Sequence, residues 1–103
     1  MLLINAFSLN MLAALPAQPS FEEVTVEEVR KLFSSGFKSA VGHADTAALF
    51  GEVLGISVPC NRITVALRKG DTAVIGQYRG PRLPEGCHVL PEGATIQWIK
   101  LEM

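Results

Sequence analysis

Apolar residues recur at helical spacing in two stretches of the chain. The segment 25–36, TVEEVRKLFSSG, opens with a capping box, in which the side chains of Thr25 and Glu28 each accept a hydrogen bond from the backbone N–H of the other. The residues that follow place apolar side chains on one face of a helix. A second stretch runs from His43 to Leu54 and carries an apolar stripe. A glycine, the usual stop signal, closes each stretch. The pattern therefore predicts two helices.

Short apolar or β-branched runs predict strands before and after these helices. MLLI at 1–4 is typical of a short buried strand, and NAFSLNML at 5–12 predicts a turn that opens a short helix. ITVAL at 63–67 and TAVIGQY at 72–78 flank the turn RKGD, which predicts a β-hairpin. TIQWIKLEM at 95–103 predicts a last strand. This mixture of elements predicts an α/β (α+β) fold.

Length and composition predict one small globular unit. The chain has 103 residues and a mass of 11.1 kDa, which suffices for a single domain, 1–103, and not for two. Hydrophobic residues make up 49% and charged residues 18%, so we expect a packed core. The mean hydropathy is +0.30, and so thinly charged a surface is typical of a subunit interface. We therefore expect a homodimer.

The charge balance and the cysteines exclude several classes of protein. A net charge of −1 and a pI of about 6.1 exclude the broad basic face that binds long nucleic acids, but not a small anionic ligand. Cys60 and Cys87 lie 27 residues apart, with no CxxC and no histidine at zinc-ligand spacing. We expect no metal site and no disulfide, and reduced cysteines favour a cytoplasmic location.

The apolar N-terminal segment is not expected to be a targeting sequence. It lacks a positively charged start and is interrupted by Asn5, Ser8 and Asn10, which argues against a signal peptide. No run approaches the ~20 apolar residues of a membrane helix, so no membrane partner is expected. The three polar residues instead follow a predicted strand, where α/β sheets commonly bind ligands.

The motifs favour chemistry that needs no metal and no cofactor. The sequence has no glycine-rich phosphate loop, no GxSxG, no HExxH and no cluster of Asp, Glu and His. Histidines, arginines, amides and hydroxyls remain. Such a set suits metal-independent cleavage of RNA, in which the ribose 2′-hydroxyl attacks and the protein aligns it and protonates the leaving 5′-oxygen.

His43 stands where a proton donor could act. The free N–H groups at a helix start, around Ala44 to Thr46, can bind a phosphate oxygen, and the Thr46 hydroxyl adds a donor. Because the helix start is positively polarised, an acid at this position needs an acidic partner. A hydrogen-bonded histidine with a purely structural role at the helix start is the alternative.

Arg82 and Glu85, in the loop PRLPEG, could supply the remaining functions. Arg82 would stabilise charge on the phosphate, and Glu85 would orient or recharge a histidine. A surface arginine and a turn glutamate explain the same pattern without function. Arg62 and Gln77, at strand ends, have the same two interpretations, and His88 is expected to be exposed or at the edge of the core.

Four motifs in order carry a resemblance to a known family. INAFSLNML, VGHADTAALF, VPCNRI and the strand ending in Gln77 with RGPRLPEG behind it resemble the viral anti-CRISPR ring-nuclease family, from about residue 2 to residue 90. The resemblance implies a small mixed β-sheet of about five strands flanked by helices, in a two-fold homodimer. It also implies binding of cyclic tetra-adenylate and its cleavage, without metal, to linear di-adenylate with a 2′,3′-cyclic phosphate, which damps type III CRISPR signalling in the host cytoplasm.

The resemblance also implies roles for individual residues. The histidine of the G-H-x-x-T motif corresponds to His43, the general acid, and the R-x-x-E-G loop supplies Arg82 and Glu85. The ligand-contacting residues correspond to Asn5, Ser8, Thr46, Arg62 and Gln77, to which we add Asn10 of the same turn. Arg79 competes with Arg82 for the phosphate, and Glu92, in a second LPEG, competes with Glu85.

Two other functions remain open at this point. The protein could sequester the same nucleotide without cleaving it, although a sponge needs no proton donor. It could also be a protein–protein adaptor, which would explain the low charge but not the ordered polar residues. The sequence does not decide between a viral and a cellular origin, or between cyclic tetra- and hexa-adenylate.

Overall fold

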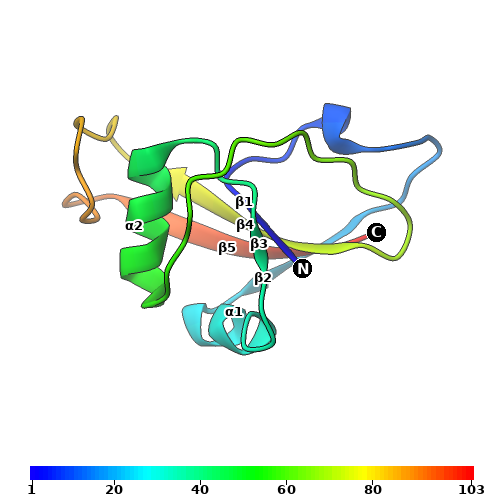
Figure 1. Cartoon of the computed structure of the whole chain (residues 1–103), viewed down its shortest axis with the longest axis horizontal. Helices are drawn as coiled ribbons and strands as arrows, with labels where there is room; N and C mark the ends of the chain where they lie inside the picture. The colour runs from blue at the N-terminus through cyan, green and yellow to red at the C-terminus, as the bar shows by residue number, and fades with distance from the viewer.

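The computed structural model describes all 103 residues and has a five-stranded mixed β-sheet at its centre (Figure 1). The strand order is β2-β5-β4-β1-β3. β1 runs parallel to both β3 and β4, whereas β5 is antiparallel to β4 and β2. The strands are β1 Leu2–Ile4, β2 Ser20–Val24, β3 Lys38–Ser39, β4 Thr72–Arg79 and β5 Thr95–Glu102. The predicted α+β class with about five strands is confirmed.

Both predicted helices are present, and a short 3₁₀ turn, η1 (Leu9–Met11), precedes them. The capping box of Thr25 and Glu28 starts α1 (Val26–Leu32), which ends one turn earlier than the predicted segment. α2 (Ala44–Leu54) ends at Gly55, whose φ of 69° is the left-handed conformation that glycine adopts easily. Neither helix has the length and apolarity needed to cross a bilayer.

The main core lies between the two helices and one face of the sheet. Apolar side chains from α1, α2 and four of the strands pack there. They are Leu3, Val24, Val29, Phe33, Val41, Ala47, Phe50, Leu54, Val74 and Trp98. Alternation along β4 turns Val74 toward the helices and its neighbours Ala73 and Ile75 toward the other face. Both faces of the central strands are therefore buried.

Irregular chain, rather than a helix, covers the second face. A smaller core of Ile4, Leu67, Ala73, Ile75 and Leu101 lies there. Partly buried Phe7, Met11 and Val65 pack against it from the segments that follow β1 and precede β4. The edge strand β2 adds Phe21, whose ring meets that of Phe7 edge to face at 5.5 Å.

The predicted hairpin of 63–67 with 72–78 is wrong, although the second run does form β4. Leu67 instead bridges in parallel to Leu12, and its N–H donates to the carbonyl of Met11 at 2.6 Å. The reason is that β1 and β5 already occupy the two edges of β4, so an apolar run beside it can only lie over the face of the sheet. β2 and β3 were not predicted.

Charged side chains accompany the pairing of the edge strand β2 with β5. Lys100 lies opposite Glu22 in the register, and its ammonium is 3.1 Å from Glu102 Oε1. The hydrogen bond to Glu102 raises the pKa of Lys100 above its usual value, and the charge of Glu22 acts in the same direction. Lys100 therefore stays protonated throughout the neutral range.

The packing of α2 against the sheet is tight at Gly76 of β4. Phe50 and Trp98 meet edge to face above it, with ring centroids 5.0 Å apart. A Cβ on Gly76 would lie 2.6 Å from Phe50 Cζ and 2.7 Å from Trp98 Cζ3. No side chain fits at this position without moving the rings.

We expect Gly76→Ala to destabilise the protein by about 1–3 kcal/mol, the usual cost of an overpacked core. Urea unfolding measures this change. In a Phe50→Leu background the same substitution should cost less, because the shorter side chain leaves room for the methyl group. Equal costs in the two backgrounds would show that the contact with Phe50 is not the constraint.

Candidate functional site

The ends of three strands bring several predicted residues to one edge of the sheet. Because β1, β3 and β4 are parallel, their carboxyl ends lie on the same side. Ile4 pairs with Ile75, so Asn5 follows directly at this edge and Gln77 lies two residues further along β4. The connection 40–43 leaves the end of β3 toward α2. This is the edge at which α/β sheets commonly bind ligands.

Hydrogen bonds from Asn61 hold its neighbour Arg62 beside the connection 40–43. Asn61 Nδ2 donates to the carbonyl of Ser39 at 2.7 Å, and the Asn61 N–H donates to Val41 at 2.8 Å. A Cβ on Gly42 would lie 3.3 Å from Cβ of Arg62, so backbone and arginine stem are in close contact there. Arg62 therefore lies next to the residue that precedes His43.

His43 occupies the N-cap position of α2 without capping it. Its φ of −124° and ψ of 125° are extended, its side chain makes no capping hydrogen bond, and the residue is exposed. The capping hydrogen bond of the structural alternative is therefore not formed. The first N–H groups of α2 have no acceptor within the helix, and Thr46 lies half-buried in the same turn.

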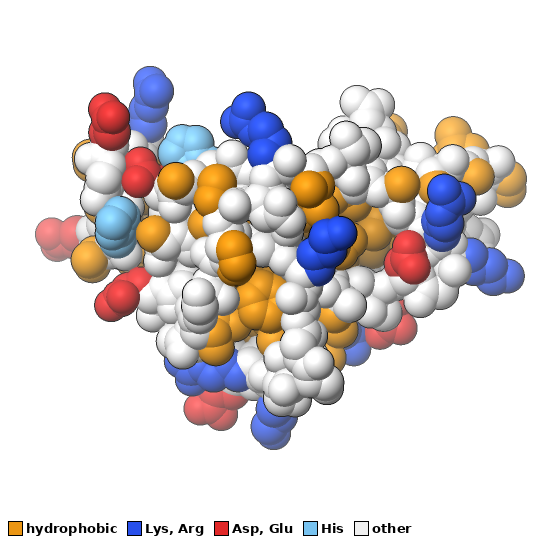
Figure 2. Space-filling model, in the orientation of Figure 1, with side chains coloured by type: hydrophobic (Ala, Val, Ile, Leu, Met, Phe, Trp, Pro, Cys, Tyr) orange, Lys and Arg blue, Asp and Glu red, His pale blue; other side chains and the backbone are white.

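The segment 80–94 between β4 and β5 comes to the same helix start. Its Gly86 N–H donates to Asp45 Oδ2 at 3.1 Å, and Arg82 and Glu85 lie exposed just before this contact. Figure 1 shows the segment beside the first turn of α2, and histidine side chains lie at this end of the molecule in Figure 2. The structure thus brings His43, Arg62 and the 82–85 loop to one region.

Arg79 lies on another face from the start of α2. In β4, Gly76 faces the helices, so Gln77 and Arg79 face the opposite side of the sheet. Arg79 Nη2 donates to Gln97 Oε1 at 3.5 Å, and Gln97 Nε2 donates to Glu23 at 2.9 Å. A shallow hollow of about 310 Å³ lies over these residues. Of the two competing arginines, only Arg82 is on the segment that contacts α2.

Ser8 and Asn10 are not brought near His43 within one chain. Ser8 is the N-cap of η1, and its hydroxyl accepts from the Asn10 N–H at 3.2 Å. Both residues are exposed. In Figure 1, η1 lies at the upper right of the sheet and α2 at its left. The turn after β1 therefore carries the chain away from the start of α2.

Asp45 is the residue at this site that the sequence analysis missed. Its Oδ1 lies 3.9 Å from Nε2 of His88, whose side chain is exposed as expected. The only local signal is an acidic residue two positions after His43, in the first turn of a helix. In the whole chain, no three His, Cys, Asp or Glu side chains gather in a way that could hold a metal ion.

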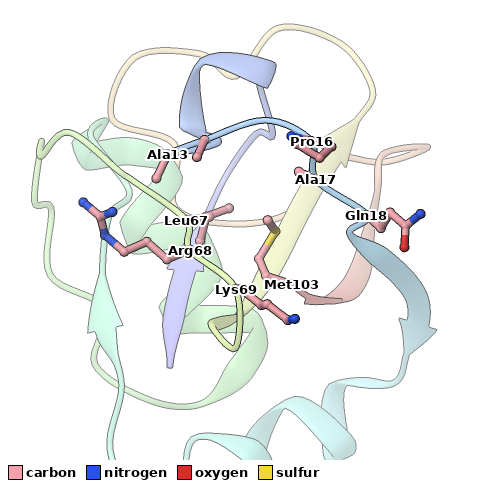
Figure 3. A pocket seen from close by; sticks show the side chains of 9 residues that line it. Ala13, Pro16, Ala17, Gln18, Leu67, Arg68, Lys69 and Met103 are labelled. Carbon is pink, nitrogen blue, oxygen red and sulfur yellow. The ribbon is translucent and has the colours of Figure 1, made fainter.

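A second hollow, larger than the one over Arg79 and Gln97, lies away from the start of α2. About 570 Å³ is enclosed by parts of the segment 13–18, by 67–69 and by Met103. Leu67 and Met103 point into this space, and the charged end of Arg68 points away from it (Figure 3). None of the predicted site residues lines it.

Similar proteins occur in archaeal viruses. Protein ORF117 of the Acidianus two-tailed virus is 37% identical over 73 residues, which cover 68% of this chain and 62% of ORF117. Protein 26 of Sulfolobus islandicus filamentous virus (isolate Iceland/Hveragerdi) is 38% identical over 81 residues, or 72% of this chain and 68% of protein 26.

A solved structure has the same fold over nearly the whole chain. B116 of Sulfolobus turreted icosahedral virus (STIV) superposes with a TM-score of 0.80 and 29% identity, covering 99% of this chain and 97% of B116. The sequence model of the STIV B116-like family matches residues 1–99. The chain therefore belongs to the STIV B116-like family, and its relatives named here are proteins of archaeal viruses.

Proposed function

We propose that the protein is a metal-independent ring nuclease that cleaves cyclic tetra-adenylate to linear di-adenylate with a 2′,3′-cyclic phosphate. In the cytoplasm of the host this activity would damp type III CRISPR signalling. The observation that carries the proposal is the exposed His43, which does not cap its helix and lies between two contacts. Before it, Gly42 packs against the stem of Arg62, and after it, Asp45 accepts from the Gly86 N–H, next to the 82–85 loop. The choice of substrate rests on the resemblance of the four sequence motifs to the ring-nuclease family.

The proposed reaction is an in-line transfer within the RNA backbone. The ribose 2′-oxygen attacks the adjacent phosphorus and loses its proton to solvent, while the bond from phosphorus to the 5′-oxygen breaks. His43 donates a proton to that departing oxygen. The first N–H groups of α2 and the Thr46 hydroxyl hold a phosphate oxygen, and Arg82 stabilises the charge that develops. Glu85 orients or recharges the imidazole.

A two-fold homodimer is part of the proposal. Of the proposed ligand contacts, Asn5 lies at the edge where the parallel strands end, whereas Gln77 faces the opposite side of the sheet and Ser8 and Asn10 lie at the 3₁₀ turn η1. A ring of four nucleotides on a two-fold axis would present equivalent phosphates to two copies of the protein. Residues that are separate in one copy would then contact one ligand.

His43→Ala is expected to slow cleavage by roughly 10² to 10⁴, the range for the loss of a general acid, and to leave binding largely intact. Cleavage is measured on purified protein with cyclic tetra-adenylate in EDTA, with products resolved by mass spectrometry. Binding is measured in parallel by thermal shift. Cleavage at the wild-type rate would refute the role of His43, and an intact ring that still stabilises the wild-type protein would identify a sponge.

Arg82→Ala should lower kcat/KM by far more than Arg79→Ala. The reason is that Arg82 lies on the segment that contacts α2, whereas Arg79 is engaged with Gln97 on the other face of the sheet. The loss expected for Arg82 is about 10- to 1,000-fold, as for a group that stabilises developing charge. The opposite order of the two variants in the same assay would assign the phosphate to Arg79.

A further inference from the structure

The segment that carries Arg82 and Glu85 is attached to the rest of the protein on both sides of these residues. On one side, the hydroxyl of Tyr78 donates to the carbonyl of Pro81 at 2.6 Å. On the other, the N–H of Gly86 donates to Asp45 Oδ2 at 3.1 Å. The first contact belongs to the strand from which the segment leaves, and the second reaches across to α2.

The base of the segment is closed by tight packing of its two ends. A Cβ on Gly80 would lie 2.6 Å from Cβ of Ala94 and 3.1 Å from the hydroxyl of Tyr78. Ala94 is 7% exposed, whereas most residues between these ends are exposed. The base therefore fixes where the segment leaves the sheet, and its distal part needs another attachment.

Asp45 provides that attachment with both of its carboxylate oxygens. Oδ2 accepts from the Gly86 N–H, and Oδ1 faces Nε2 of His88 at 3.9 Å. The side chain of Asp45 is 19% exposed, and hydrogen bonds from N–H groups to a carboxylate are stronger than those to a neutral acceptor. Asp45 lies two residues after His43 and binds the residue that follows Glu85.

We propose that Asp45 is a positioning residue that docks the segment 80–94 on the first turn of α2 and thereby holds Glu85 and Arg82 beside His43. The docking follows from contacts within the free protein. Its effect on cleavage rests on the proposed function. Without Asp45 the segment would lose the hydrogen bond that links it to the helix of the acid, and small displacements of catalytic groups are costly.

The docking is tested by hydrogen exchange of the Gly86 amide, measured by NMR in the free protein. Asp45→Ala should accelerate this exchange by roughly tenfold or more, because a charge-assisted hydrogen bond is lost. Asp45→Asn keeps an acceptor oxygen and should preserve most of the protection. Asp71→Ala is the matched control, since Asp71 Oδ2 accepts from the Arg68 N–H at 2.8 Å in a distant turn. It should leave Gly86 unchanged.

The positioning role is tested by cleavage of cyclic tetra-adenylate. Asp45→Ala should lower kcat by roughly 10- to 100-fold with a smaller change in KM, Asp45→Asn should recover much of the loss, and Asp71→Ala should behave as wild type. Unchanged Gly86 exchange in Asp45→Ala would overturn the docking. Faster exchange with undiminished cleavage would overturn the positioning role. If wild-type protein leaves the ring intact, the proposed function and the positioning role fail together, while the exchange result still decides the docking.

Discussion

The packing of α2 on the sheet depends on residue 76 being a glycine, which has no side chain. Phe50 of α2 and Trp98 of β5 pack edge to face over this residue, and a Cβ there would lie within 2.7 Å of both rings. Aromatic side chains supply much of the buried area of a small core, so their contact sets how closely α2 lies on the sheet. The position of α2 in turn determines where its first turn, with His43, meets the ends of the parallel strands.

Groups from other elements hold α2 at both ends. At its C-terminus, Nε of Arg30 in α1 donates to the carbonyl of Leu54 at 2.6 Å, where a positive charge also complements the helix dipole. At its start, Asn61 binds the residues that lead into the helix, and Asp45 binds the segment 80–94. A helix fixed in this way is a suitable support for a reactive group, since its own position does not have to be established when a ligand binds.

The elements that could be predicted from the sequence are those with local signals. The capping box at Thr25 and the glycine stop after Leu54 act within a few residues of where they stand, so both helices were predicted. The run 63–67 has the composition of a strand, but the edges of β4 were already taken, and that competition is not visible locally. β2 reads SFEEV, with polar residues at three of five positions, and β3 has only two residues. The contact of Gly86 with Asp45 joins positions 41 residues apart, so no local pattern indicates it.

The position of the predicted ligand contacts constrains what kind of ligand could use them all. His43 and Arg62 gather at the start of α2, whereas Ser8 and Asn10 lie at the 3₁₀ turn η1, at the other end of the molecule in Figure 1. A single small nucleotide at His43 would reach only the first group. A ligand that contacts both groups must either extend across one chain or lie between two copies. A ring with repeated identical units fits the second arrangement, because each copy then meets an equivalent phosphate and no residue has to serve two different roles.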